Sequence, residues 1–397
     1  MAQSLREFKT ITGRRTAVQN QSGISLDAIG ANELSGSQAS ARNCENMIGT
    51  TSVPLGVAGP LSIECIGESL HGTRTIYLPL ATTEGALVAS VNRGCKACLD
   101  TNNPIHVYVK EYGATRGPVF YVRSMEEGIQ LESYIKDHWE ALGDIARRTS
   151  SHISLVSFFL DGAGSYRFVR FVFTTGNAMG LNMVTLATDA IIKHIKQDAG
   201  ISPVALSGNY CVDKKASWMN MLMGRGRPVR AEITLPSEVI QTVLKTTAGA
   251  IYEVWMAKCM MGSVMSGSLG WNAQAANVLA ALFLATGQDL AHVVEGSQAI
   301  TTTNIIPGKN GEGDALMIGV YLPDCMVGTV GGGTALPTQR EALGILGVAD
   351  GNDPESALWL SAIVGAAVLA GEISLLASLA QGSLAGTHAR LARGKNI

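Results

Sequence analysis

Short apolar runs bounded by Gly and Pro recur along the chain, and some of them alternate with polar residues. Such runs are typical of strands, whose side chains point to opposite faces in turn. Two stretches between them, Val57-Ala-Gly-Pro60 and Ala114-Thr-Arg-Gly-Pro118, have the composition of turns. The pattern predicts strands at residues 61–66, 73–80, 104–110, 119–122, 153–159, 165–174, 204–206, 229–235 and 313–322.

Longer periodic runs predict helices. Thr82 or Thr83 can cap a helix that holds Glu84 in its first turn and continues to Lys96. A long helical region is expected to start at residue 237 and to continue to residue 295. Other helices are expected at residues 126–148, 183–197, 337–346 and 353–380.

Two uncharged segments, residues 259–288 and 357–371, raise the question of a membrane span. The first carries Ser, Asn and Gln side chains that are too polar to face lipid. The second is shorter than the ~20 apolar residues that a span needs. We expect both segments to be helices buried inside protein and no contact with a membrane. The alternative, a membrane protein, rests only on the hydropathy of residues 259–288.

The order of the elements predicts an α/β (α+β) fold with a small domain inserted into a larger one. Residues 1–44 are polar and predict a small helical lead-in. Strands and helices alternate in residues 118–205, which indicates an inserted, ferredoxin-like α+β domain. The large domain, built around a long buried helix, would comprise residues 45–117 and 206–397.

Composition narrows the function classes. Hydrophobic residues make up 46% of the chain and charged residues 16%, which favours close packing and a homo-oligomer. The net charge of −2 gives no support to nucleic-acid binding. Seven scattered cysteines predict reduced thiols and a cytoplasmic protein, and the charged N-terminus does not resemble a signal peptide. The lone pair Cys95 and Cys98 is too little for a metal site, so no metal is expected.

Four titratable residues stand in notable contexts. Glu84 lies at a predicted helix start, Lys214 follows a turn-like Ser-Gly-Asn, and Asp289 ends the uncharged run. His388 lies among small residues. Each alone also fits a purely structural role, such as a helix cap or a solvated turn. Together they supply a carboxylic acid, an ammonium group, a carboxylate and an imidazole, which suits carbonyl chemistry.

Several ordered blocks give the chain a likeness to a known family. They are Glu45-Asn-Met-Ile-Gly with Val53-Pro-Leu-Gly-Val-Ala-Gly-Pro60, Ala81-Thr-Thr-Glu-Gly85, Asn92-Arg-Gly-Cys-Lys96, Thr115-Arg-Gly-Pro118, Asn177-Ala-Met-Gly-Leu-Asn182, Ser207-Gly-Asn-Tyr-Cys-Val-Asp-Lys-Lys215, Gly287-Gln-Asp289 and Gly328-Thr-Val-Gly-Gly-Gly-Thr334. As a set they resemble the catalytic region of class I 3-hydroxy-3-methylglutaryl-coenzyme A (HMG-CoA) reductases, from Glu45 to His388. Any one block alone would be weak.

The resemblance implies a four-electron reduction of HMG-CoA to mevalonate and coenzyme A by two NADPH in succession, a step of isoprenoid biosynthesis. Lys214 would stabilise the thioester oxyanion and the mevaldehyde carbonyl. Glu84 would donate a proton to that carbonyl, and Asp289 would orient Lys214 and tune Glu84. His388 would protonate the departing coenzyme A thiolate.

The resemblance also implies binding residues. The hydroxymethylglutaryl group would contact Arg116, Ser207, Asp213, Lys215, Lys258 and Asn277. Coenzyme A would contact Ser90, Asn92, Arg93 and Lys96. NADPH would contact Asn177, Ala178, Met179, Gly180, Leu181, Asn182 and Arg393, in agreement with the lack of a G-x-G-x-x-G motif after a strand. Active sites would form between the subunits of a homodimer or homotetramer.

The chain departs from the family pattern at a few positions. Asn177 stands where aspartate is usual, and Gly270-Trp-Asn272 is one glycine shorter than the usual motif. These departures motivate an alternative hypothesis, a catalytically weakened relative that binds acyl-CoA. The residues also leave NADH open as the reductant in place of NADPH.

Overall fold

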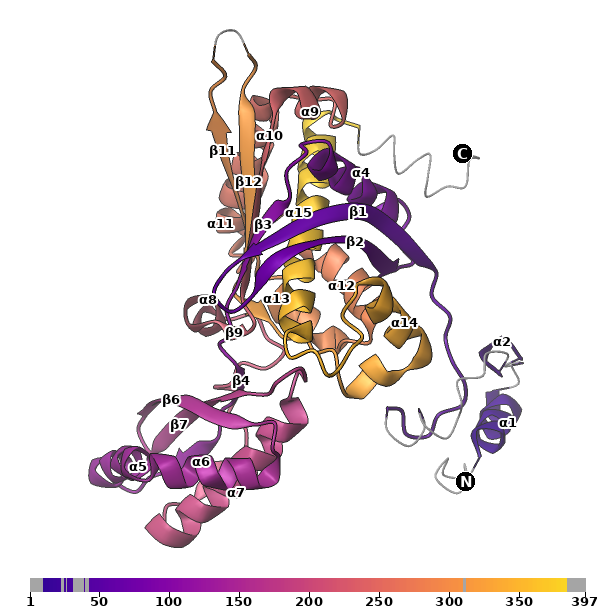
Figure 1. Cartoon of the computed structure of the whole chain (residues 1–397). Coiled ribbons are helices and arrows are strands. Elements are labelled where there is room, and N and C mark those ends of the chain that lie inside the picture. Colours follow the sequence, from indigo (N-terminus) through magenta and orange to yellow (C-terminus); the bar gives the residue numbers. More distant parts are fainter. Residues whose placement is uncertain are drawn as a thin grey trace.

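A computed structural model describes residues 10–22, 25, 27–30, 39, 43–309 and 312–383. Its largest sheet has six strands in the order β11-β12-β10-β3-β1-β2 (Figure 1). Only the β1–β3 pair is parallel, and the other neighbours are antiparallel. The strands are β1 (Leu55–Ile66), β2 (His71–Ala81), β3 (Ile105–Val109), β10 (Val229–Leu235), β11 (Ile300–Ile306) and β12 (Ala315–Leu322).

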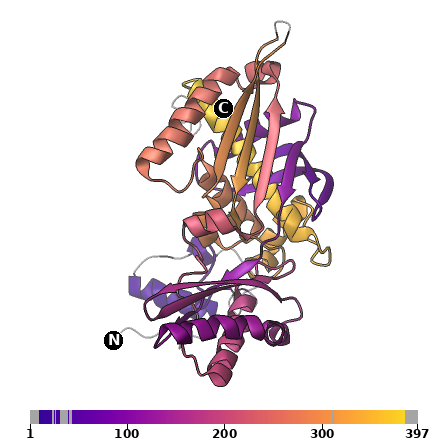
Figure 2. The same cartoon turned by 90° about the vertical axis from the view of Figure 1, so that its left-hand side faces the viewer.

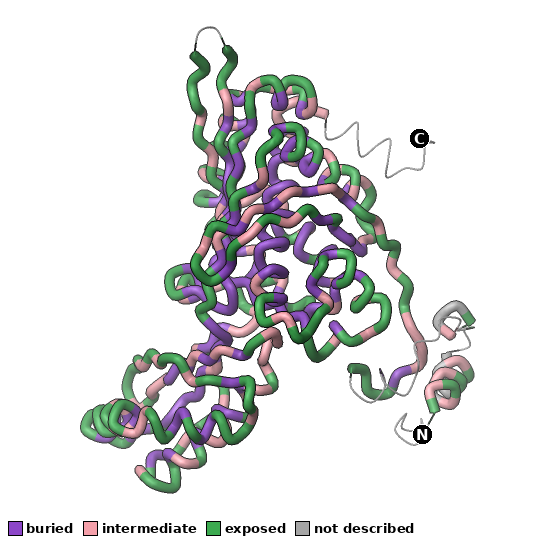
Figure 3. Tube along the Cα trace, in the orientation of Figure 1, coloured by how far each residue is buried: buried purple, intermediate pink, exposed green. Residues whose placement is uncertain are grey.

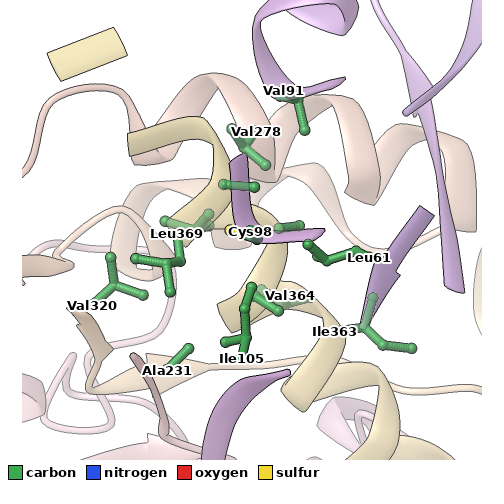
Figure 4. Packing of buried hydrophobic residues seen from close by; sticks show 14 of the residues in the cluster. Leu61, Val91, Cys98, Ile105, Ala231, Val278, Val320, Ile363, Val364 and Leu369 are labelled. Atoms are coloured by element: carbon green, nitrogen blue, oxygen red, sulfur yellow. The ribbon is translucent and has the colours of Figure 1, made fainter. Parts of the chain in front are cut away.

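The long helix α15 (Ser356–Ala380) lies against this sheet and is buried along nearly its whole length (Figure 3). Helices α4 (Leu87–Leu99) and α12 (Ala275–Thr286) pack beside it. Figure 4 shows the core between them, with Leu61, Val91, Ile105, Ala231, Val278, Val320, Ile363, Val364 and Leu369. The sequence correctly predicted a large unit built around a long buried helix.

Among the described residues, α15 is the one helix long and apolar enough to cross a membrane by length and composition. However, 94% of its most apolar 18-residue window is buried inside the protein. Its apolar side chains therefore pack against the sheet and the neighbouring helices, as those of a core helix in a folded domain do.

A second sheet lies at the opposite end of the molecule, the lower part of Figures 1 and 2. Its strand order is β4-β7-β5-β8, and β6 pairs with β7. The strands are β4 (Ala114–Arg116), β5 (Val119–Tyr121), β6 (Ser154–Ala163), β7 (Tyr166–Thr174) and β8 (Pro203–Ala205). Helices α5 (Met125–Asp137), α6 (Trp139–Thr149) and α7 (Leu181–Ala199) share a separate hydrophobic core with it. The predicted mixed α/β fold is thereby confirmed.

Shorter elements complete the described chain. At the N-terminal side lie α1 (Ile11–Ser22) and α2 (Asp27–Gly30). The others are α8 (Trp218–Met223), β9 (Arg225–Gly226), α9 (Ser237–Thr242), α10 (Ala248–Trp255), η2 (Met256–Gly262), α11 (Ser263–Ser266), η3 (Leu290–His292), α13 (Val293–Gly296), β13 (Asp324–Cys325), η4 (Gly332–Ala335) and α14 (Pro337–Ile345). Strands β9 and β13 form a short parallel pair.

Two helix predictions are wrong. Residues 237–295 do not form one continuous helical region, because Gly267 takes a left-handed conformation and a loop separates α11 from α12. Glu84 does not lie in the first turn of a helix, since α4 begins only at Leu87. Ala86 precedes it with a φ of 76°, which a helix does not contain.

The two predicted turns are also wrong. Residues 57–60 belong to β1, where a register shift between Ala58 and Leu61 accommodates the Gly-Pro pair against β2. Residues 114–116 form β4, which pairs with β7. Strand β11 was not predicted, because four polar residues (Thr301 to Asn304) occupy its centre.

Candidate active site

Lys214 lies in the loop between β8 and α8, with a left-handed backbone (φ 58°). Its Nζ lies 2.6 Å from Asp289 Oδ2, and each of the two side chains is 38% exposed. Its backbone N–H donates to Oε1 of buried Glu295 at 3.2 Å. The ammonium group is thus held by a carboxylate but still reaches solvent, as a group that must meet a substrate does.

Asp289 follows the C-terminus of α12, where Gly287 (φ 71°) ends the helix. Its Oδ1 accepts a hydrogen bond from Ala291 N at 3.1 Å and so caps η3. Burial alone would raise the pKa of Asp289, but hydrogen bonds from Lys214 and Ala291 and the nearby His292 lower it below its usual value. Asp289 is therefore a carboxylate that fixes the position of the Lys214 ammonium group.

Glu84 lies in the turn between β2 and α4, where its backbone N–H donates to Thr82 Oγ1 at 3.0 Å. Its Oε1 accepts from Asn277 Nδ2 on α12 at 3.4 Å. Buried Glu372 of α15 secures this end of α12, because its carboxylate accepts from the backbone N–H groups of Ala273 and Gln274 at 2.7 Å each. An anion at a helix N-terminus is favoured by the helix dipole.

Glu84 and Asn277 line a cavity of about 650 Å³, which extends to Leu290, the residue after Asp289. A second cavity of about 460 Å³ is lined by Lys258, Ser266 and Asn272. Ala276 lines both cavities, so they adjoin at the start of α12. These spaces are large enough for a small acyl group.

The structure places the other proposed substrate-binding residues around the Lys214 loop. Asp213 Oδ2 lies 3.9 Å from Arg116 Nη1, which comes from β4. Lys215 is exposed, and its Nζ donates to Asp213 O at 3.3 Å. Ser207 Oγ lies 3.5 Å from Cys211 Sγ. Lys258 lines the second cavity together with Ala216, which follows Lys215 in the loop.

A buried ion network beneath the loop was missed from the sequence. Arg225 of β9 is fully buried and pairs with Asp213 at 2.9 Å and with Glu295 at 3.0 Å. Asp324 lies 3.8 Å from the same guanidinium group, and His292 contacts Glu295. The available signal was the spacing of Asp289, His292 and Glu295 at three-residue intervals after an uncharged run.

The four proposed coenzyme A residues lie on or beside one helix, α4. Ser90 Oγ donates to Ser374 Oγ of α15 at 3.0 Å, and Arg93 Nε donates to the same oxygen at 3.1 Å. Asn92 Oδ1 accepts from Gly59 N at 3.0 Å. Lys96 is exposed and pairs with Asp100 at 2.8 Å. Ser90, Asn92 and Arg93 thus anchor α4 in this structure, whereas Lys96 faces solvent.

The proposed nucleotide segment, residues 177–182, joins β7 to α7. Asn177 Nδ2 donates to Asp353 O at 2.6 Å, and Asn177 Oδ1 accepts from Ala357 N at 3.2 Å. Gly180 (φ 85°) precedes α7, and a Cβ there would lie 2.2 Å from Thr175. The proposed residues His388 and Arg393 lie outside the described residues.

A lysine held by a carboxylate beside a cavity that carries another carboxyl group suits an enzyme for carbonyl chemistry. Comparisons with known proteins identify the family of this enzyme. A profile of the family described as hydroxymethylglutaryl-coenzyme A reductase matches residues 10–393. The chain belongs to this family, as its sequence blocks predicted, and it is an oxidoreductase.

Close relatives support this assignment. The 3-hydroxy-3-methylglutaryl-coenzyme A reductase of Methanothermobacter thermautotrophicus is 45% identical over 96% of this chain and 93% of its own length. That of Haloferax volcanii is also 45% identical, over 96% of this chain and 92% of its own length.

A solved structure shares the fold. It is the class II 3-hydroxy-3-methylglutaryl-CoA reductase of Streptococcus pneumoniae bound to NADPH in open conformations, which matches with a TM-score of 0.64 and 17% identity. The match covers 94% of this chain and 98% of that one.

Proposed function

We propose that this protein reduces (S)-HMG-CoA to mevalonate and coenzyme A with NADPH, as a reductase of class I. The observation that carries the proposal is the 2.6 Å contact between Lys214 Nζ and Asp289 Oδ2, beside the cavity that holds Glu84. Relatives of the same family at 43–46% identity are archaeal reductases, which supports the class.

Lys214 is the electrophilic catalyst in this proposal. Its ammonium group would donate a hydrogen bond to the thioester oxygen and stabilise the negative charge that develops there. Asp289 keeps the ammonium group oriented, while Glu84, held by Asn277, would give a proton to the carbonyl oxygen of the aldehyde intermediate. His388 would protonate the coenzyme A thiolate as it leaves.

The substrate's free carboxylate needs a cationic partner. Lys258 lines one cavity and Lys215 is exposed beside the loop, so both have an ammonium group available. Arg116 lies near Asp213 at 3.9 Å, too far for a tight pair. We infer that these cations bind the hydroxymethylglutaryl carboxylate, and that Ser207, Asp213 and Asn277 hold its hydroxyl and carbonyl groups. Lys96 would meet the phosphates of coenzyme A.

NADPH would supply hydride, and the start of α7 fits one of its phosphates. The helix is 19 residues long and has no acidic residue in its first turn. Gly180 provides no side-chain cap, which leaves the first backbone N–H groups without a side-chain partner. Such groups bind anions. Residues 177–182 would therefore hold the nucleotide, and residues 118–205 would act as the nucleotide-binding domain.

We infer a cytoplasmic homodimer or homotetramer with active sites between subunits. Near Lys258, helices η2 and α11 expose Met261, Val264 and Met265, whose exposed fractions are 55%, 63% and 84%. A run of exposed apolar side chains beside the cavity suits burial against a second copy of the chain.

The variant Lys214→Ala tests the proposed function. It removes the oxyanion donor, so kcat for HMG-CoA-dependent NADPH oxidation should fall ~10²–10³-fold. Binding of HMG-CoA, measured by calorimetry, should remain detectable, and so should the folded circular dichroism spectrum. Lys193→Ala, which changes an exposed lysine of α7, is the matched control and should keep full turnover. Full activity in Lys214→Ala would overturn the proposal.

A further inference from the structure

Glu295 is a buried hub directly beneath the Lys214 loop. One of its oxygens, Oε1, accepts from Lys214 N at 3.2 Å and from Arg225 Nη1 at 3.0 Å. The same oxygen contacts His292 Nδ1. The side chain of Glu295 is fully buried, so no water competes for these donors. One carboxylate thereby joins the catalytic loop, β9 and η3.

The contact with the Lys214 backbone matters because that backbone is strained. A left-handed conformation costs a residue with a Cβ about 1–2 kcal/mol, and Lys214 has a φ of 58°. Such conformations persist where the surroundings hold them. The hydrogen bond from Lys214 N to Glu295 is the polar contact of its backbone that reaches out of the loop. It fixes the point from which the ammonium group extends.

His292 lies on the other side of the same carboxylate, and only 1% of it is exposed. Nδ1 contacts Glu295, whereas Nε2 is buried without a hydrogen-bond partner. Nε2 lies 3.7 Å from Asp289 Oδ2, the oxygen that pairs with Lys214, and 3.9 Å from Asp213 Oδ1. The imidazole of His292 therefore faces the carboxylates of Asp289 and Asp213.

A metal ion is a competing explanation for this cluster. Ligand atoms of Asp213, His292 and Glu295 all lie within 4.8 Å of one another. However, the guanidinium group of Arg225 already contacts both Asp213 and Glu295. It supplies the positive charge that a cation would bring. The cluster is thus an ion network with a histidine whose second nitrogen is free to carry a proton.

We propose that Glu295 and His292 are positioning residues for the reduction, Glu295 by holding the backbone of Lys214 and His292 by placing a proton against Asp289. The inference rests on the proposed function. A proton on Nε2 would point at Asp289 Oδ2, the oxygen that pairs with Lys214 Nζ, and would restrain that carboxylate beneath the ammonium group.

Several charged groups surround His292 and Glu295. The groups that face or adjoin the network are Asp213 and Lys214 of the loop, Asp289, Glu295 of α13, Arg225 of β9, Asp324 of β13 and Arg170 of β7.

Two conservative variants separate the roles. Glu295→Gln keeps the volume and one acceptor oxygen but removes the charge that holds Lys214, Arg225 and His292. His292→Asn retains a donor toward Glu295 and removes the nitrogen that faces Asp289. Each should lower kcat by about tenfold to a hundredfold, the cost of a small misplacement of a catalytic group, with little change in the KM for HMG-CoA. Glu238→Gln and His152→Asn, at exposed positions, are the controls.

The separation of kcat from KM gives a readout that a merely structural role would not produce. In both variants kcat should fall while the KM for HMG-CoA and the melting temperature stay close to those of the wild type. An unchanged kcat in both variants would overturn the proposal. A parallel loss of thermal stability and of HMG-CoA binding in both variants would show a structural role and overturn it as well.

A second measurement is independent of turnover. In protein labelled with ¹⁵N-lysine, the Lys214 amide signal, assigned through its loss in Lys214→Ala, should shift upfield in Glu295→Gln because its carboxylate acceptor is gone. An unshifted signal would overturn the role of Glu295 even if the chain proved to lack reductase activity. An inactive wild type with the expected shift would instead contradict the proposed function alone.

Discussion

Single residues at this site work in pairs that come from distant parts of the sequence. Lys214 pairs with Asp289, and Glu84 pairs with Asn277, each across a gap of many residues. The family blocks contain Lys214, Asp289 and Glu84, whereas Asn277 lies outside them. Their pairing required the fold, because a loop and the end of a helix meet only after α12 has packed.

The buried charged residues beneath the Lys214 loop could not be predicted from the sequence. No pattern in the sequence singles out Arg225, yet it is fully buried among Asp213, Glu295 and Asp324. Hydrophobic pattern does not predict a buried arginine, since arginine is mostly exposed. Its place depends on partners that are distant in sequence, which a single sequence does not connect.

Asp324 gives a pH-dependent prediction. Burial raises its pKa to about 8, although Arg225 acts in the opposite direction. The folded state therefore holds this proton more tightly than the unfolded state, and stability is lost as pH rises from about 4 toward 8. The side chain introduced by Asp324→Asn is neutral at every pH in this range. The melting temperature of the variant minus that of the wild type should therefore increase from pH 5 to pH 9. A constant difference across that range would contradict the shift.

At the scale of elements, the contact between α4 and α15 has almost no spare space. A Cβ added to Gly94 would lie 1.9 Å from Ala370 O, a backbone atom that side-chain rotation does not move. Gly94→Ala should therefore destabilise the protein by about 1–3 kcal/mol or more. Gly249→Ala, in exposed space on α10, should instead stabilise it by about 0.5–1 kcal/mol. The free energy of unfolding of both variants, measured with urea, checks this difference. An equal change in the two variants would contradict the close contact between α4 and α15.

Most elements were predictable, and the exceptions have physical reasons. β10 was predicted with its observed bounds because its residues alternate between buried and exposed faces. The continuous helix over residues 237–295 was wrong because small polar residues are compatible with both helix and loop. The loop before α12 exists because buried Glu372 accepts its backbone N–H groups, a tertiary contact that local sequence does not reveal.

At the scale of the whole molecule, the Lys214 loop connects the two sheets. It follows β8 of the smaller sheet and leads to α8 beside the larger one. Tyr210 in this loop stacks with Phe159 and Phe168 of the smaller sheet, with ring centroids 6.1 Å and 5.3 Å apart. The alternation of strands and helices predicted the mixed fold. The contact between Asn177 and residue 353 could be identified only from the structure.

The proposed assembly gives a prediction at the same scale. Met265→Asp places a charge on the exposed apolar run of α11 and should convert the oligomer to a monomer of 41.6 kDa in light scattering. It should also lower turnover, because the sites lie between subunits in this proposal. Ile129→Asp, on an exposed position of α5, is the control and should leave the mass unchanged. A wild-type monomer with full activity would contradict the shared sites.

The ratio of NADPH oxidised to mevalonate formed decides whether this protein carries out the four-electron reduction. The chain is supplied with HMG-CoA, NADPH loss is followed by absorbance, and mevalonate and the free coenzyme A thiol are quantified in the same reaction. The proposed four-electron reduction requires two NADPH oxidised and one thiol released for each mevalonate. Accumulation of the aldehyde after a single NADPH, or no NADPH oxidation with intact binding of HMG-CoA, would contradict it.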